Sequence, residues 1–270
     1  MKWGIIGTGN MGSMLTTSLI KSGAIPAHDL TIYNRTSKKA EDLQEEFPNL
    51  NVAKDLISLQ KTSEILFICV KPHHYKDIID SLKEEWTENQ CLVSITSPVA
   101  VKQLEKATPC QVARIVPSIT NHALAGVSLF TFGSRINEKY RQLLLTTFQQ
   151  ISTPIEVEEE HIRVASDIVS CGPAFISYLL SEWIKAAGDV AGLPEQKATA
   201  LTENMMIGLG ELLSQRIMTL DELMEKVTVK GGVTGEGLQA LEDHIGPLFH
   251  KMFQATQNKH KEDKQNIDLQ

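Results

Sequence analysis

One motif near the start of the chain limits the possible fold more than any other feature. Residues 2–6 form a short apolar run that passes directly into Gly7-Thr8-Gly9-Asn10-Met11-Gly12. In a βαβ unit, this G-x-G-x-x-G spacing gives a tight turn, a close approach of the backbone to a pyrophosphate, and close packing of helix on strand. The N–H groups at the start of the helix favour an anion there. The sequence therefore predicts that these six residues bind a dinucleotide, with a purely structural glycine turn as the alternative.

The first half of the chain alternates short apolar runs with helical patterns. Several of the runs are continuous, which is typical of strands buried on both faces of a parallel sheet. We expect strands at residues 2–6, 30–33, 65–70, 91–95, 112–116, 127–132 and 155–157, and helices at residues 10–21 and 38–47. This alternation predicts an α/β fold, with a doubly wound parallel sheet of the Rossmann type over residues 1–158.

The pattern changes after a polar hinge at residues 156–160. Residues 173–191 and 195–215 carry apolar side chains at helical spacing, separated by Gly192-Leu193-Pro194. The apolar stripes are wide for so short a domain, which indicates burial against a second subunit. We expect an all-helical C-terminal dimerisation domain at residues 159–270. Its last residues, 256–270, are mostly polar and are expected to fray.

Composition narrows the classes of partner and the cellular compartment. The net charge of −7, without a basic block, argues against a nucleic-acid partner. The cysteines are widely spaced and lack a C-x-x-C pair, which suits a reducing cytosol without disulfides: Cys69, Cys91, Cys110 and Cys171. A strand and a glycine turn stand where a signal peptide would be, and no stretch approaches the roughly 18 apolar residues of a membrane helix. We expect a cytoplasmic protein that binds neither nucleic acid nor membrane.

The end of the second predicted strand indicates which dinucleotide binds. An NAD site usually has an acidic residue here to hold the ribose 2′-hydroxyl. This chain instead has Asn34, Arg35 and Thr36. A guanidinium fork and small donors suit a doubly charged phosphate, so the sequence predicts NADP(H) in preference to NAD(H). The alternative is a solvated basic turn that precedes a helix.

The third clear strand ends in Val70, Lys71 and Pro72. Ligands of open α/β sheets lie outside the carboxyl ends of the strands, so these residues are candidates for cofactor contact. An exposed lysine at a strand end is an equally good interpretation. His73 and His74 follow, and without a third ligand at metal spacing we interpret them as surface histidines.

Five motifs resemble those of pyrroline-5-carboxylate reductases in sequence and in order: residues 7–12, 34–36, 70–72, Cys171-Gly172-Pro173-Ala174-Phe175, and Gly231-Gly232-Val233-Thr234. The resemblance covers nearly the whole chain. It implies reduction of 1-pyrroline-5-carboxylate to L-proline with NAD(P)H. It also implies an intertwined homodimer, with higher oligomers of dimers in the family, and a substrate pocket between the nicotinamide and the partner's helical domain.

The substrate side is predicted at residues 230–234. Gly231, Gly232 and Val233 precede or open a helix, where free backbone amides bind a carboxylate well. Thr234 adds a hydroxyl, and the resemblance implies that it lies near the ring nitrogen as a hydrogen-bond or proton donor. Lys230 could supply charge for the same carboxylate. The alternative is a tight turn in which Thr234 only caps a helix.

Other positions depart from the family pattern. The usual Ser-Pro before the glycine pair is Val229-Lys230, and the stretch that begins at Arg114 keeps only that arginine and Pro117. These changes resemble the divergent ComER branch of the family, associated with a late competence operon. Asp167 and His161 are further polar candidates, which we interpret as helix-capping or solvent-facing groups.

Two functions remain open on these residues. The first is an NADPH-dependent reductase of a cyclic imine that carries a carboxylate. The second is an NADP-binding regulatory paralogue, associated with competence, with little or no reductase activity. A β-hydroxyacid dehydrogenase is a third interpretation, but its catalytic lysine motif has no clear counterpart, since Lys185 is the only lysine within residues 173–191.

Overall fold

The computed structural model describes residues 1–265 and residue 267. It divides into two compact units. The first comprises Met1–Pro173 together with the chain from Ala255 onward, and the second comprises Ala174–Gln254. The chain thus leaves the first unit within a long helix and returns to it within the last helix.

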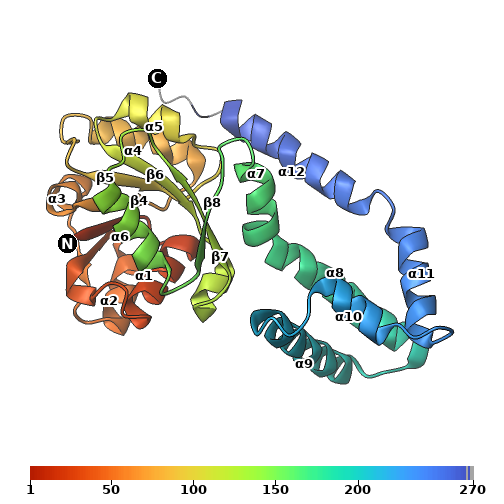
Figure 1. The fold of residues 1–270 in the computed structure, drawn as a ribbon. Helices are drawn as coiled ribbons and strands as arrows, with labels where there is room; N and C mark the ends of the chain where they lie inside the picture. Colours follow the sequence, from red (N-terminus) through yellow and green to blue (C-terminus); the bar gives the residue numbers. More distant parts are fainter. Residues whose placement is uncertain (266, 268–270) are drawn as a thin grey trace. The chain divides into compact units, whose positions relative to one another are not determined.

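The first unit is built on one eight-stranded sheet (Figure 1) with the strand order β3-β2-β1-β4-β5-β6-β7-β8. The strands are β1 (Trp3–Ile6), β2 (Leu30–Tyr33), β3 (Asn51–Val52), β4 (Ile65–Ile68), β5 (Cys91–Ser94), β6 (Gln111–Val116), β7 (Val127–Phe132) and β8 (Thr153–Glu156). This order confirms the predicted Rossmann-type sheet, and every predicted strand is present. The short edge strand β3 was not predicted.

One pair departs from the predicted parallel sheet, because β7 runs antiparallel to β6. The other neighbouring strands are parallel. Residues 117–126 connect β6 to β7 and contain only a short 3-10 helix, Ile119–Ala123. A parallel return needs a crossover of about a dozen residues or more, so this connection favours an antiparallel neighbour.

Helices cover both faces of the sheet, and each face has its own core. The helices of this unit before the hinge are α1 (Asn10–Lys21), α2 (Ser37–Glu46), α3 (Leu56–Thr62), α4 (Tyr75–Ser81), α5 (Val101–Ala107) and α6 (Glu138–Phe148). Successive residues of β4 show the division: Phe67 belongs to one core cluster, and Leu66 and Ile68 belong to the other. Burial on both faces explains why the sequence of β4 is apolar throughout.

The remaining chain is helical: α7 (Ile162–Ser166), α8 (Gly172–Ala191), α9 (Glu195–Ser214), α10 (Leu220–Val227), α11 (Val233–Ile245) and α12 (Leu248–Gln265). This confirms the all-helical C-terminal region. A π-helical turn, Asp167–Cys171, joins α7 to α8. The helix expected to start at Pro173 therefore continues a helix that starts at Ile162. The wider turn accommodates a proline that cannot donate a backbone hydrogen bond.

This joined helix, Ile162–Ala191, is long and apolar enough to cross a membrane by length and composition. Charged residues interrupt it, and its uncharged stretch from residue 168 to residue 181 is shorter than the roughly 18 uncharged apolar residues considered in the sequence analysis. Only 11% of its most apolar window is buried within the chain. Within α8, no residue is buried.

The end of the chain also differs from expectation. Residues 256–265 were expected to fray, but they continue α12. The Thr256 hydroxyl donates to Asp167 Oδ2 at 2.7 Å, and His260 is only 7% exposed. Ile267 belongs to a core cluster of the sheet unit. A few well-placed contacts thus order a mostly polar segment. Residues 266 and 268–270, to which the same expectation applied, lie outside the described residues.

Candidate functional site

The glycine motif forms the turn between β1 and α1, and its three glycines have different surroundings. Gly7 has a φ of +96°, and a Cβ there would lie 2.7 Å from the carbonyl oxygen of Cys69. At Gly12 a Cβ would lie 1.9 Å from the Gly7 oxygen, so helix and turn touch there. Gly9 differs, because a Cβ there would meet no atom within 4 Å. The turn is therefore closed by Gly7 and Gly12 and leaves open space over Gly9.

Asn34 fastens this turn to the end of β2. The backbone N–H of Thr8 donates to Asn34 Oδ1 at 3.0 Å, and Asn34 Nδ2 donates to the Thr36 carbonyl at 2.9 Å. The N–H of Gly7 donates to the Tyr33 carbonyl at 2.7 Å. Both ends of the Asn34 amide are therefore engaged in holding two loops together.

A cavity of about 340 Å³ opens beside these loops. Gly7, Asn34, Arg35, Thr36 and Val70, all predicted from sequence, line it. The other lining residues are Ile6, Tyr33, Lys39, Leu56, His74, Asp77, Ile78 and Ser81. They come from the ends of β1 and β2, from α2 and α3, and from α4 with the turn that precedes it. The cavity thus lies outside the carboxyl ends of the strands, as ligand sites of this fold do.

Two cations in this cavity have no acidic partner within the described part of the chain. Arg35 and Lys39 are exposed and make no ion pair there, whereas the neighbouring Lys38 lies 2.8 Å from Asp42. Lys39 also lines a second cavity, of about 340 Å³, together with Thr8, Gly9 and Asn10. Asp42 and Glu46 also line this second cavity, but they pair with Lys38 and Lys21, so they leave the charges of Arg35 and Lys39 available to an anion.

The other predicted cofactor residues lie nearby in different environments. Met11 packs against the core, and Gly12 is buried. Lys71 and Pro72 follow β4 but do not line the cavity. The rings of His73 and His74 lie 4.1 Å apart, and only His74 lines the cavity. Among the described residues, no cluster of three or more His, Cys, Asp or Glu could hold a metal ion.

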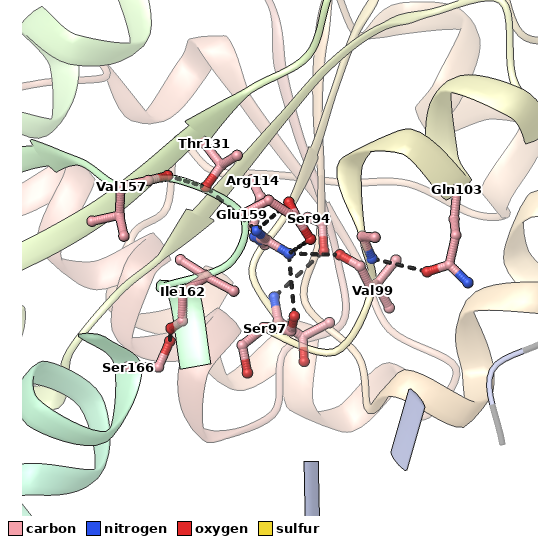
Figure 2. A network of polar contacts seen from close by, with 12 residues as sticks. Ser94, Ser97, Val99, Gln103, Arg114, Thr131, Val157, Glu159, Ile162 and Ser166 are labelled. Carbon is pink, nitrogen blue, oxygen red and sulfur yellow. Dashed lines mark hydrogen bonds and ion pairs between the residues drawn. The ribbon is translucent and has the colours of Figure 1, made fainter. Parts of the chain in front are cut away.

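A second polar centre surrounds Arg114 on β6 (Figure 2). Its side chain is fully buried, and Nη1 donates to the backbone carbonyls of Ser97 at 3.1 Å and Val99 at 3.2 Å. Nη1 and Nη2 also donate to the two carboxylate oxygens of Glu159, at 3.1 and 2.6 Å. Burial lowers the pKa of Arg114, and the Glu159 carboxylate opposes that effect. The bidentate pair joins the hinge to β6, and the bonds to Ser97 and Val99 join β6 to the loop after β5.

Arg163 extends the same centre toward the π-helical turn. Nη1 donates to Ser97 Oγ at 3.0 Å, and Nη2 pairs with the Asp167 carboxylate and lies 3.3 Å from Cys171 Sγ. Asp167 is 1% exposed and also accepts from Thr256. The interpretation of Asp167 as a capping or solvent-facing group was therefore wrong. By contrast, His161 is exposed, as expected.

The predicted substrate residues lie at the start of α11, in the second unit. Gly231 has a φ of +73°, and Gly232 is the N-cap of the helix and donates to the Val229 carbonyl at 2.9 Å. Lys230 and Val233 are exposed. Backbone N–H groups at a helix start of this kind face outward without partners in the helix.

Thr234 has a different setting from its neighbours. It lines an open, largely apolar cavity of about 480 Å³ between α9, α10 and α11, together with Leu209, Leu212 and Thr228. The Thr228 hydroxyl is buried and has no partner in the described residues. Thr234 thus stands between the polar helix start and an apolar hollow.

Comparisons with known proteins agree with this geometry. Residues 159–263 match the family model "Pyrroline-5-carboxylate reductase dimerisation", and residues 2–98 match "NADP oxidoreductase coenzyme F420-dependent". The chain is 46% identical over 263 residues to ComE operon protein 4 of Bacillus subtilis, covering 97% of this chain and 96% of that protein. The chain belongs to the pyrroline-5-carboxylate reductase family.

Within the family, two further comparisons are informative. Pyrroline-5-carboxylate reductase 3 of Bacillus subtilis is 29% identical over 259 residues, covering 96% of this chain and 95% of that protein. A crystal structure of Plasmodium falciparum pyrroline carboxylate reductase with NADP bound has a TM-score of 0.83 at 21% identity, covering 99% and 98% of the two chains. The family member thus has an NADP-binding oxidoreductase fold, and the predicted resemblance to the ComER branch is confirmed.

Proposed function

We propose that this family member is an NADPH-dependent reductase of a cyclic imine and that it converts 1-pyrroline-5-carboxylate to L-proline. The observation that carries the proposal is the cavity beside the glycine turn, where Arg35 and Lys39 lack acidic partners in the described residues. Two free cations and the absence of an acid at the end of β2 favour a ribose 2′-phosphate over a 2′-hydroxyl. We therefore propose NADP(H) in preference to NAD(H).

The open space over Gly9 fits the cofactor, because a pyrophosphate must approach the backbone there. Residues 7–12, 34–36 and 70–72 would form the cofactor site, with Asn34 holding the loops in position. When bound, NADPH supplies the hydride for reduction of a C=N bond.

The start of α11 is the proposed substrate site. The amides of Gly231, Gly232 and Val233 would hold the substrate carboxylate. Lys230 would add positive charge beside Val229, the position at which the family pattern has a serine. The Thr234 hydroxyl would donate a hydrogen bond to the ring nitrogen and pass a proton to it while taking one from water, as the adjacent carbon accepts hydride. Thr234 is therefore the proposed catalytic residue.

We propose that residues 1–158 bind NADP and that residues 159–270 dimerise and contribute the substrate site. The exposed face of α8 supports dimerisation, since Ile176, Trp183 and Val190 follow one another at seven-residue spacing and are 44%, 60% and 88% exposed. Trp183→Glu should turn a dimer into a monomer in analytical ultracentrifugation, whereas Lys185→Glu should not.

We also propose that the protein is cytoplasmic and that it binds neither nucleic acid nor membrane.

The decisive experiment mixes the purified protein with NADPH and 1-pyrroline-5-carboxylate and follows NADPH absorbance. Thr234→Ala should slow turnover by about 10²-fold, the usual scale for loss of a positioned proton donor, and Thr234→Ser should retain most of it. Absence of turnover with this imine and with related cyclic imines would refute the reductase.

A second candidate is an NADP-binding regulatory paralogue. It is favoured by Val229, which stands 64% exposed where relatives have a serine that can hold the substrate carboxylate. It predicts micromolar binding of NADP by calorimetry without imine turnover. Failure to bind NADP would refute both candidates.

A further inference from the structure

One face of α4, together with the turn before it, lines the cavity of the proposed cofactor site. His74, Asp77, Ile78 and Ser81 all line it, whereas Tyr75 and Asp80 do not. The spacing i, i+3, i+4 and i+7 places these four residues on a single side of a helix. The helix therefore presents one apolar and three polar side chains to whatever occupies the cavity.

The two sides of the cavity carry opposite charge. Arg35 and Lys39 follow β2, while Asp77 follows β4, and these strands lie on opposite sides of β1. Ile6, Leu56 and Ile78 add apolar surface to the same cavity. Such a cavity suits a flat ring with a phosphate toward the β2 side and a hydrogen-bond donor toward the β4 side.

The Asp77 carboxylate is free to accept that donor. It is exposed and makes no ion pair within residues 1–265 and 267. The Ser81 hydroxyl donates to the Asp77 backbone carbonyl at 2.6 Å, so it leaves the carboxylate unengaged. An ionised carboxylate only accepts hydrogen bonds, and it repels a carbonyl oxygen that faces it.

We infer that Asp77 reads the base of the dinucleotide by accepting a hydrogen bond from the exocyclic amino group of adenine. This inference rests on the proposed NADP site and adds a specificity residue to it. Asp77 selects an aminopurine, while Arg35 and Lys39 select the 2′-phosphate. The preference for the amino group and the preference for the 2′-phosphate are separate, because Asp77 and the two cations lie on opposite sides of the cavity.

The test compares the affinities of NADPH and its hypoxanthine analogue, nicotinamide hypoxanthine dinucleotide phosphate, by calorimetry. The analogue has a carbonyl oxygen in place of the amino group. The protein should bind NADPH about tenfold more tightly, the scale of one hydrogen bond to a charged group. In Asp77→Asn the preference for NADPH over the analogue should fall to about twofold or less. A carboxamide can accept a hydrogen bond from the amino group or donate one to the carbonyl oxygen.

Asp80→Asn is the matched control, since Asp80 lies on the same helix outside the cavity lining. It should keep the full preference, and Lys39→Ala should weaken both ligands equally. If NADPH binds but the analogue binds equally well, the inference about Asp77 is wrong and the proposed cofactor stands. If NADPH does not bind, the proposed cofactor is wrong and the inference falls with it.

Discussion

The backbone N–H of Thr8 donates to the side-chain oxygen of Asn34 at 3.0 Å, and this contact joins the glycine turn to the loop after β2. The other end of the Asn34 amide donates to Thr36. A carboxylate at position 34 would keep the first bond and lose the second. It would also place negative charge where the 2′-phosphate is proposed to bind.

Asn34→Asp should therefore exchange the cofactor preference. We expect NADPH affinity to fall by about tenfold to a hundredfold through charge repulsion, while NADH affinity stays the same or rises, since an acid can hold a ribose 2′-hydroxyl. Calorimetry with both reduced cofactors measures the change. Asn34→Ser, which adds no charge, should weaken both cofactors together; if Asn34→Asp does the same, the charge argument is wrong.

Gly9 and Gly12 form a matched pair, because the structure gives them opposite surroundings. Gly12→Ala places a Cβ 1.9 Å from the Gly7 carbonyl oxygen, and backbone on both sides must move. We expect a loss of about 1–3 kcal/mol in the free energy of unfolding by urea titration. In Gly9→Ala the new Cβ has no atom within 4 Å. The stability of this variant should therefore change little, while its affinity for NADPH should fall. Equal stability of both variants would contradict this division of roles.

The sequence predicts the parts of the site whose chemistry is local. The glycine turn and the Asn34-Arg35-Thr36 turn depend on neighbouring residues, and the structure brings both to one cavity. His74 and Asp77 were missed as cavity residues. Their helical spacing is visible in the sequence, but which side of α4 faces the cavity depends on how the helix packs on the sheet.

The polar centre at Arg114 shows a second limit. Its partners Ser97 and Glu159 are 17 and 45 residues away, and no periodicity connects them. Asp167 has the same character, since its partner Thr256 lies 89 residues along the chain. When a single polar side chain pairs with a residue far along the chain, the sequence around it shows no pattern. An acid in a buried ion pair therefore cannot be told from a solvent-facing acid by sequence alone.

Glu159→Gln tests how strongly the hinge is fixed. The change keeps the shape of the side chain but leaves the buried Arg114 guanidinium without its counter-charge. We expect the free energy of unfolding to fall by about 2–3 kcal/mol, which is the scale of a hydrogen bond to a charged group. A fully buried ion pair would cost more to break, but the Glu159 side chain is 39% exposed. Glu158→Gln, a neighbouring exposed acid, is the control and should unfold like the parent protein. A similar midpoint for both variants would mean that the Arg114–Glu159 pair contributes little.

His260 on α12 should make the docking of the last helix depend on pH. Burial lowers the pKa of His260 from 6.5 to about 4, and the nearby cations Lys264, Arg163 and Arg114 act in the same direction, against Asp263. The folded protein therefore holds this histidine neutral in a pH range where the unfolded chain protonates it. Because the unfolded state binds more protons, stability should fall as the pH is lowered from about 6.5 toward about 4.

The contribution of His260 is measured as a difference between two proteins. Thermal midpoints of the parent and of His260→Gln should be recorded at several pH values from 7 down to 4, because carboxylates common to both proteins also titrate at the acidic end. The parent should lose more stability than the variant between about pH 6.5 and pH 4. Thr256→Val, which removes the bond to Asp167 but keeps His260, should lower the midpoint by a similar amount at every pH. Parallel curves for the parent and His260→Gln would show that this histidine protonates equally in the folded and unfolded states.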